Sequence, residues 1–207
     1  MNPKEELQAI RQIMERSSKF LSLSGLAGIF AGICALIGAA VAYFIILDSG
    51  YILNNEFLQS LGNSQANQIG LYLAIDALLV LFFACIGAIY FSYRKAKIGG
   101  QAFWSASSKR LVLHLLIPLV TGGIFAMILI LRNNLDLVAS VTLIFYGLAL
   151  VNAGKFTFGE IHYLGLTEIV LGILAGIFIN QGLLFWAIGF GVMHIVYGIV
   201  MYDRYER

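Results

Sequence analysis

A set of ionisable side chains lies inside or at the edge of long apolar stretches of this sequence: Asp76, His114, Glu160, His162, Glu168 and His194. If those stretches cross a bilayer, a charged group near the centre costs about 2.5–3.5 kcal/mol on insertion scales, so each one that remains needs a partner or a function. Carboxylates and imidazoles bind protons near physiological pH and also ligate metals. The chemistry open to this set is therefore proton binding or metal binding.

Glu168 and His194 stand out because each shares a helix face with small residues. Steps of three or four residues connect them to Gly165, Gly172 and Gly176, and to Ala187, Gly191 and Gly198, respectively. Small residues mark the faces on which membrane helices approach closely, so both side chains are expected to point into the protein. Both also lie at nearly equal distances from a turn at Asn180-Gln181. We predict a Glu168–His194 contact in the cytoplasmic half of the bundle.

His114 lies one turn inside another apolar stretch, four residues before Pro118. Proline cannot donate a backbone hydrogen bond, so a helix kink is expected at Pro118, in a place where protein or water satisfies the freed carbonyl. These features predict a polar cavity open to the cytoplasm. Its expected ring consists of His114, Glu168 and His194, with His162 and Glu160 as further candidates.

Three interpretations of this polar cluster remain open. It is an interhelical hydrogen-bond cluster that fixes the register of the helices, a proton-responsive site, or a metal site. The sequence contains no His-x-x-x-His or His-x-x-Glu spacing, so no metal or cofactor is predicted. Asp76 is expected to stand apart in the outer half, where it reaches outer water with Arg132 or Asn133 as partner.

The elements that position these residues follow from composition. Hydrophobic residues make up 60% of the 207-residue chain and charged residues only 12%. A membrane-spanning helix needs about 20 apolar residues, so the sequence predicts an all-α, polytopic six-helix transmembrane bundle. The expected spans are 20–47, 71–91, 111–131, 135–153, 161–179 and 182–202, within a domain covering 20–207. A re-entrant hairpin is the alternative for the last two spans.

The basic residues predict the orientation of the bundle. All of the 13 Lys and Arg residues except Arg132 fall in the N-terminal arm, the second and fourth loops, or the C-terminal tail. Positively charged loops remain cytoplasmic, so both termini are expected in the cytoplasm and the protein in the inner (plasma) membrane. The charge balance of +2 and the low charged fraction exclude a nucleic-acid-binding domain.

Residues 1–19 predict an amphipathic cytoplasmic helix. Leu7, Ile10 and Met14 recur at helical spacing after a start signal at Asn2-Pro3. Such a helix lies on the inner leaflet or binds a cytoplasmic partner. The two cysteines, Cys34 and Cys85, fall inside spans, where they are either inert packing residues or close enough to meet.

Internal similarity connects the first and fifth spans. The segments GLAGIFAGICALI from Gly25 and GLTEIVLGILAGI from Gly165 share more than half of their residues, which would imply three hairpin repeats of the same orientation. This glycine spacing, together with WAIGFGVMHIVYGI from Trp186, resembles the short repeats of HdeD-like membrane proteins. The resemblance covers about a third of the chain and implies a small six-helix inner-membrane protein connected with acid tolerance. The placement of Glu168 and His194 departs from that pattern.

The sequence lacks the motifs of the common enzyme classes, including Gly-x-Ser-x-Gly, His-Glu-x-x-His, Walker A and Gly-x-Gly-x-x-Gly, so no enzyme is expected. The first hypothesis is a non-enzymatic membrane protein that responds to acid or envelope stress. The second is a small transporter or channel subunit with a proton or solute site at Glu168–His194. The third is a scaffold that recruits a cytoplasmic protein; a homo-oligomer is also compatible with the sequence.

Overall fold

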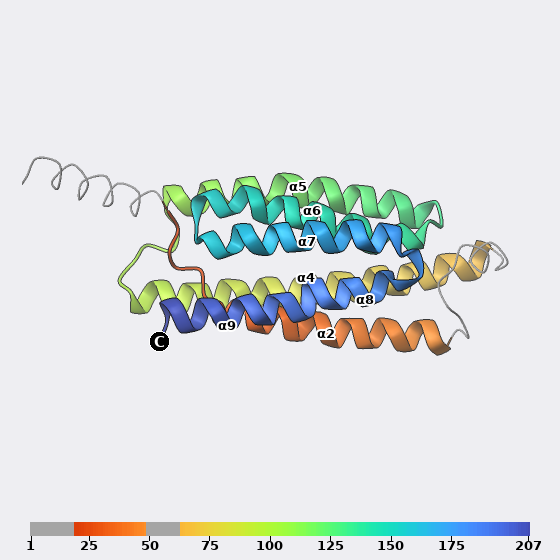
Figure 1. Ribbon diagram of the computed structural model, residues 1–207, viewed down its shortest axis with the longest axis horizontal. Helices are drawn as coiled ribbons and strands as arrows, with labels where there is room; N and C mark the ends of the chain where they lie inside the picture. Colours follow the sequence, from red (N-terminus) through yellow and green to blue (C-terminus); the bar gives the residue numbers. More distant parts are fainter. Residues whose placement is uncertain (1–18, 49–62) are drawn as a thin grey trace, which may run out of the picture.

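The computed structural model of the chain describes residues 19–48 and 63–207, and within those ranges every regular element is helical (Figure 1). Six helices are long and apolar enough to cross a membrane, as predicted. The first five are α2 (Gly25–Asp48), α4 (Asn63–Ile98), α5 (Ala106–Leu131), α6 (Val138–Ala153) and α7 (Gly159–Ile177). The sixth consists of α8 (Gly182–Trp186), η4 (Ala187–Met193) and α9 (His194–Tyr205). Short 3-10 turns, η1 (Leu135–Leu137), η2 (Gly154–Phe156) and η3 (Ile179–Gln181), precede α6, α7 and α8.

The helix bounds differ from the predicted ones, and the first two spans show the physical reasons. The first span begins at Gly25 instead of Phe20, because the preceding residues are held by the α6–α7 connection: Phe20 N donates to Phe156 O at 2.7 Å, and Thr157 Oγ1 donates to Phe20 O at 2.7 Å. The second span is longer than 71–91, since α4 continues to Ile98 through Lys95 and Lys97. Lysine is a good helix former and is favourable near a helix C-terminus. The amphipathic helix predicted over 1–19 lies outside the described residues, apart from Lys19.

The helices form two groups of three (Figure 1). In one group α6 packs between α5 and α7, and in the other α2 packs between α4 and α9. The last span passes between the groups, because α8 contacts α6 and α7 whereas α9 packs against α2. The last two spans therefore do not form a closely packed hairpin of their own. This pairing departs from the three hairpins that the internal similarity would imply.

Glycines set the closest approaches within each group. A Cβ added at Gly147 of α6 would lie 2.6 Å from the carbonyl oxygen of Gly165 in α7, and one added at Gly198 of α9 would lie 2.8 Å from that of Gly25 in α2. Backbones this close leave no room for side chains between them. The small-residue faces predicted around Glu168 and His194 are thus packing faces, one against α6 and the other against α2.

The last span contains a segment that is not α-helical. α5 runs through Pro118 as one continuous helix, whereas η4 is a seven-residue π-helix between α8 and α9. A π-helix widens the turn and redirects the side chains that follow, and such segments are frequent at functional sites. η4 also marks the passage of the last span from one helix group to the other.

Candidate functional site

Glu168 occupies the middle of α7, with equal lengths of helix on either side, and its side chain is 0% exposed. Neither carboxylate oxygen has a hydrogen-bond partner among the described residues. Gly189 lies against it, and a Cβ added at Gly189 would collide with both Glu168 Oε2 and the side chain of Leu143, which is also 0% exposed. Glycine at position 189 therefore provides the space that the carboxyl group occupies.

His194 is the nearest polar neighbour of Glu168. Its Nδ1 lies 3.4 Å from Glu168 Oε1, which confirms the predicted contact. The contact lies at the middle of α7. The imidazole is itself buried, with 6% of the residue exposed.

The hydrogen bonds of His194 assign its tautomer. Nδ1 lies 3.0 Å from the carbonyl oxygen of Gly189, and a carbonyl only accepts, so Nδ1 carries a hydrogen. Nε2 lies 2.7 Å from the hydroxyl oxygen of Tyr146. In the neutral ring the Tyr146 hydroxyl donates to Nε2, whereas in the protonated ring Nε2 donates to Tyr146. Both states keep this hydrogen bond, so the ring can change charge without moving.

Sequence reasoning missed Tyr146. It lies on α6, and its ring centroid is 4.9 Å from that of Phe190 and 5.3 Å from that of His194. The available signal was a tyrosine in the interior of a predicted span, away from the interfaces where tyrosine is usual in membrane proteins. The hydroxyl of Tyr146 satisfies the side of the imidazole that faces away from Glu168.

Glu168, His194 and Tyr146, which we name the central cluster, connect the two helix groups. Glu168 and Tyr146 belong to α7 and α6, and His194 begins α9 at the end of the π-helix. Apart from apolar contacts, the attachment of α9 to the α5–α6–α7 group thus includes a polar contact whose charge depends on bound protons. A change in the number of protons would act directly on the packing between the groups.

The other residues of the expected cavity lie elsewhere. His114 is exposed on α5 and stacks on Phe156 with centroids 4.8 Å apart. Glu160 pairs with Arg204 and accepts from the Tyr205 hydroxyl, both at 2.9 Å. His162 packs against Gly154. The predicted ring of His114, His162 and Glu160 around Glu168 and His194 is wrong, because His114 is exposed, Glu160 pairs with the C-terminal helix and His162 packs on η2.

Asp76 also differs from its prediction. It lies half-buried on α4 against Gly38 of α2, and neither Arg132 nor Asn133 pairs with it. The reason is that α4 packs mainly on α2 and only slightly on α5, whose end carries Arg132. Cys34 and Cys85 are free thiols, the first half-buried and the second exposed. Within residues 19–48 and 63–207, no three His, Cys, Asp or Glu side chains gather to hold a metal ion.

The end of the bundle that carries the C-terminus contains a second set of polar contacts. We name it the basic end, after Lys19, Arg94, Lys95, Lys97, Lys109, Arg110, Lys155, Arg204 and Arg207. Here Glu206 accepts from Gly25 N at 2.5 Å, from Ser24 Oγ at 2.9 Å and from Lys95 Nζ at 3.2 Å. The residue near the end of the chain thereby caps the first turn of α2, a connection that the sequence did not indicate.

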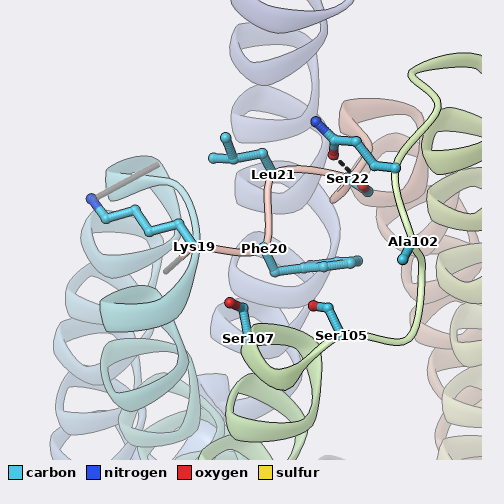
Figure 2. A pocket seen from close by; sticks show the side chains of 8 residues that line it. Lys19, Phe20, Leu21, Ser22, Ala102, Ser105 and Ser107 are labelled. Atoms are coloured by element: carbon cyan, nitrogen blue, oxygen red, sulfur yellow. Dashed lines mark hydrogen bonds between the residues drawn. The ribbon is translucent and has the colours of Figure 1, made fainter. Parts of the chain in front are cut away.

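A pocket of about 240 Å³ opens beside these contacts (Figure 2). It lies between the segment that precedes α2 and the start of α5, and Ser22 Oγ donates to Gln101 Oε1 at 2.8 Å across its wall. Ser105 caps α5 by accepting from Ser108 N at 3.2 Å. The pocket is polar, but its hydroxyl groups already serve to hold the α4–α5 connection.

The chain was compared with protein-family models, with curated proteins and with solved structures, and none of them matches it. The resemblance to HdeD-like proteins therefore remains one of glycine spacing alone. On composition and structure, the chain is a multi-pass, six-helix membrane protein.

Proposed function

We propose that this chain is a non-enzymatic inner-membrane protein that responds to acid or envelope stress by binding protons at the central cluster. The observation that carries the proposal is Glu168, a carboxyl group at mid-membrane that is fully buried and without a hydrogen-bond partner among the described residues. A structural cluster that only fixed helix register would satisfy its polar atoms, because an unpaired buried group costs stability. An acceptor left open is what a site for a proton requires.

The central cluster lies between the two helix groups, so proton binding there changes the contact between them. The charges of the Glu168 carboxyl and the His194 imidazole set whether their contact is an ion pair, a neutral contact or a contact with one charge. Because these side chains come from different helix groups, each state stabilises the packing of α9 against α7 differently. The glycine contacts along the same two helices leave little room for the backbones to absorb the change.

The orientation belongs to the same proposal. We place the basic end, and with it both termini, in the cytoplasm, since Arg132 is the single Lys or Arg at the opposite end within the described ranges. Labelling of single cysteines at position 207 and position 132 with a membrane-impermeant reagent in intact cells tests this. Labelling at 132 alone agrees with the proposal, and labelling at 207 alone overturns it.

The test of function is thermal unfolding in proteoliposomes between about pH 5 and pH 8, where histidine and buried carboxyl groups change charge. We expect the melting temperature of the wild type to depend on pH, and Glu168→Gln to remove most of that dependence, because glutamine keeps the shape without the titration. Glu160→Gln is the matched control, since Glu160 is a carboxylate of the same helix that pairs with Arg204 at the basic end. An unchanged pH profile in Glu168→Gln would overturn the proposal.

A transporter is the second candidate, favoured by the π-helix beside an unpartnered carboxyl group at mid-membrane. The same vesicles distinguish it. With a pH-sensitive dye inside, a transporter carries protons or a co-solute down an imposed gradient at a rate that Glu168→Gln abolishes. The acid-response proposal expects the dye signal to equal that of empty vesicles, together with the pH-dependent melting.

A further inference from the structure

The buried face of α7 differs in character on the two sides of Glu168. Toward the basic end this face carries Leu164 and Ile161, four and seven residues before Glu168, and both are buried. Toward the opposite end it carries Gly172 and Gly176, four and eight residues after Glu168. Residues at these spacings lie on one side of a helix. Glu168 is therefore followed by large apolar side chains in one direction and by glycines in the other.

The apolar direction is closed by a cluster of packed side chains, which we name the apolar plug. Its members, all buried, are Leu150, Phe158, Ile161, Leu164 and Met201. The plug extends to the basic end, where Lys95 Nζ lies 5.1 Å from the centre of the Phe158 ring. None of the five side chains carries a group that titrates. A proton that enters from the basic end thus meets a layer of interlocked apolar groups.

A polar seam lies in the other direction, where the start of α6 packs on the end of α7. Ser140 of α6 is buried, and its Oγ donates to the carbonyl oxygen of Gly172 at 2.7 Å. A Cβ added at Gly176 would lie 2.9 Å from the same Oγ. Asp136, four residues before Ser140 and also buried, brings a carboxyl group to the start of α6. We name these four residues the Ser140 seam; it ends at Gly172, about 6 Å along α7 from Glu168.

One apolar side chain, Leu143, fills the space between the Ser140 seam and Glu168. A Cβ added at Gly172 would lie 3.0 Å from Leu143 Cβ, and one added at Gly189 would lie 2.6 Å from Leu143 Cδ2 and would also collide with Glu168 Oε2. Leu143 therefore borders both the seam and the carboxyl group. A single leucine changes rotamer without a change in the backbone, whereas opening the apolar plug requires several packed side chains to move together.

The other elements packed on α7 offer Glu168 no second route of titratable groups. His194 of α9 contacts Glu168, and Tyr146 of α6 hydrogen-bonds to His194. The remaining titratable residues of α9 follow His194 toward the basic end, and η2 carries only Lys155, at that same end. α8, η3 and η4 contain no ionisable side chain.

We infer that the central cluster exchanges protons with the membrane face opposite the basic end, through the Ser140 seam, and that Leu143 is the gate of this route. The inference rests on the proposed function, in which the cluster binds protons, and adds the side from which they come. When Leu143 rotates away, a hydronium ion gives one proton to the Glu168 carboxylate and leaves as water. Ser140 holds the incoming water, because its oxygen still accepts hydrogen bonds while its hydrogen is donated to Gly172. With the basic end in the cytoplasm, the protein responds to acid on the outer side of the membrane.

Sided labelling of Glu168 tests the direction of access in the wild-type protein. A hydrophobic carbodiimide modifies protonated carboxyl groups within membranes, and mass spectrometry of the peptide that contains Glu168 measures the modification. Right-side-out and inverted vesicles from expressing cells expose opposite ends of the bundle to the bath, and the cysteine labels at positions 132 and 207 identify the exposed end. With the lumen buffered at about pH 8, the bath is shifted from about pH 8 to about pH 6. We expect labelling to rise about threefold or more when the end opposite the basic end faces the bath, and to change little when the basic end faces it.

The outcomes of this labelling separate the inference from the proposed function. Labelling that follows the pH at the basic end, or the pH on both sides equally, overturns the route through Ser140 and leaves proton binding at the central cluster in place. Labelling that follows the pH on neither side overturns both. A protonophore, which equalises the pH across the vesicle, should give both orientations the same labelling, and Glu168→Gln gives the background.

Single substitutions test the gate through the rate of labelling from an acid bath on the seam side. Leu143→Ala should raise this rate about threefold or more, because the space left beside Ser140 and Glu168 has polar partners for water. Leu150→Ala is the matched control, since it removes the same side chain from the apolar plug, seven residues further along α6, and should leave the rate unchanged. Ser140→Ala should lower the rate about threefold or more, because the incoming water loses its hydrogen-bond partner. Equal rates in Leu143→Ala and Leu150→Ala, or a wild-type rate in Ser140→Ala, would refute the inference.

Discussion

The hydroxyl group of Tyr146 on α6 lies 2.7 Å from Nε2 of His194, the first residue of α9. This hydrogen bond joins the two helix groups on the side of the imidazole opposite Glu168. It persists whether the ring is neutral or charged, with donor and acceptor exchanged. Tyr146 therefore holds His194 in place. A change in the charge of the ring then alters its interactions with Glu168 and Gly189 on the Nδ1 side.

We expect Tyr146→Phe to destabilise the protein modestly. The substitution keeps the ring that packs on Phe190 and removes only the hydroxyl, so the loss is one interhelical hydrogen bond, about 0.6–1.7 kcal/mol in a membrane. The free energy of unfolding, measured in bilayers, gives this value. Tyr163→Phe on α7, where the side chain is 62% exposed, is the control and should change nothing measurable. Equal effects of the two variants would contradict the role of Tyr146.

A double-mutant cycle should separate the central cluster from the other histidines. Glu168→Gln and His194→Gln remove partners in direct contact, so their effects on unfolding free energy should deviate from additivity by about 0.5–3 kcal/mol. Glu168→Gln and His114→Gln should add, because His114 stacks on Phe156 on another part of the bundle. Strong coupling between Glu168 and His114 would contradict this structure and support the larger polar cavity that the sequence predicted.

The parts of this arrangement that sequence predicted are those with a periodic signal. Six apolar stretches predicted six spans, and the glycine steps around Glu168 and His194 predicted that both residues point inward and meet. Hydrophobicity and small-residue spacing act within one helix, so they can be read from one segment of chain.

The sequence predictions that were wrong depend on which helices are neighbours. Asp76 faces Gly38 of α2 instead of Arg132, and His114 faces outward, because α4 belongs to one helix group and α5 to the other. Lipid-facing and protein-facing sides of a membrane helix are both apolar, so composition does not distinguish them. The π-helix over Ala187–Met193, where the last span passes from one group to the other, has no sequence signal of its own either.

One methyl group added at the glycine contact between α2 and α9 should destabilise the protein. A Cβ at Gly198 would lie 2.6 Å from the backbone nitrogen of Ile29 and 2.8 Å from the carbonyl oxygen of Gly25, so neither neighbour can move without shifting α2. We expect Gly198→Ala to lower the unfolding free energy by about 1–3 kcal/mol, the usual cost of overpacking.

Gly123→Ala is the matched control for this contact. Gly123 lies within α5, and an added Cβ there meets nothing within 4 Å. Alanine favours a helix over glycine by about 0.5–1 kcal/mol, so this variant should be slightly more stable than the wild type. The two glycine substitutions should therefore have opposite signs. A gain of stability in Gly198→Ala would show that α2 and α9 are less closely packed than in this structure.

Glu206 should control the opening of the first turn of α2. Its carboxylate accepts from the backbone nitrogen of Gly25 and from Ser24 Oγ, and Lys95 Nζ lies 3.2 Å away. An acid at a helix N-terminus satisfies amide groups that have no partner within the helix and interacts favourably with the helix dipole. We expect Glu206→Ala to increase hydrogen–deuterium exchange at the amides that begin α2, measured by mass spectrometry on the peptide containing Gly25.

Arg207→Ala provides the comparison for Glu206, because it also removes a charge from the tail but leaves the cap. Arg207 lies just beyond α9 and pairs with Asp203, four residues earlier near the end of that helix, and both side chains are largely exposed. Such a surface pair contributes little, so exchange at the start of α2 should match the wild type. Lys95→Met should give an intermediate increase, since it removes the cation beside Glu206 and keeps the Gly25 hydrogen bond. Equal protection in Glu206→Ala and Arg207→Ala would mean that the tail does not cap α2.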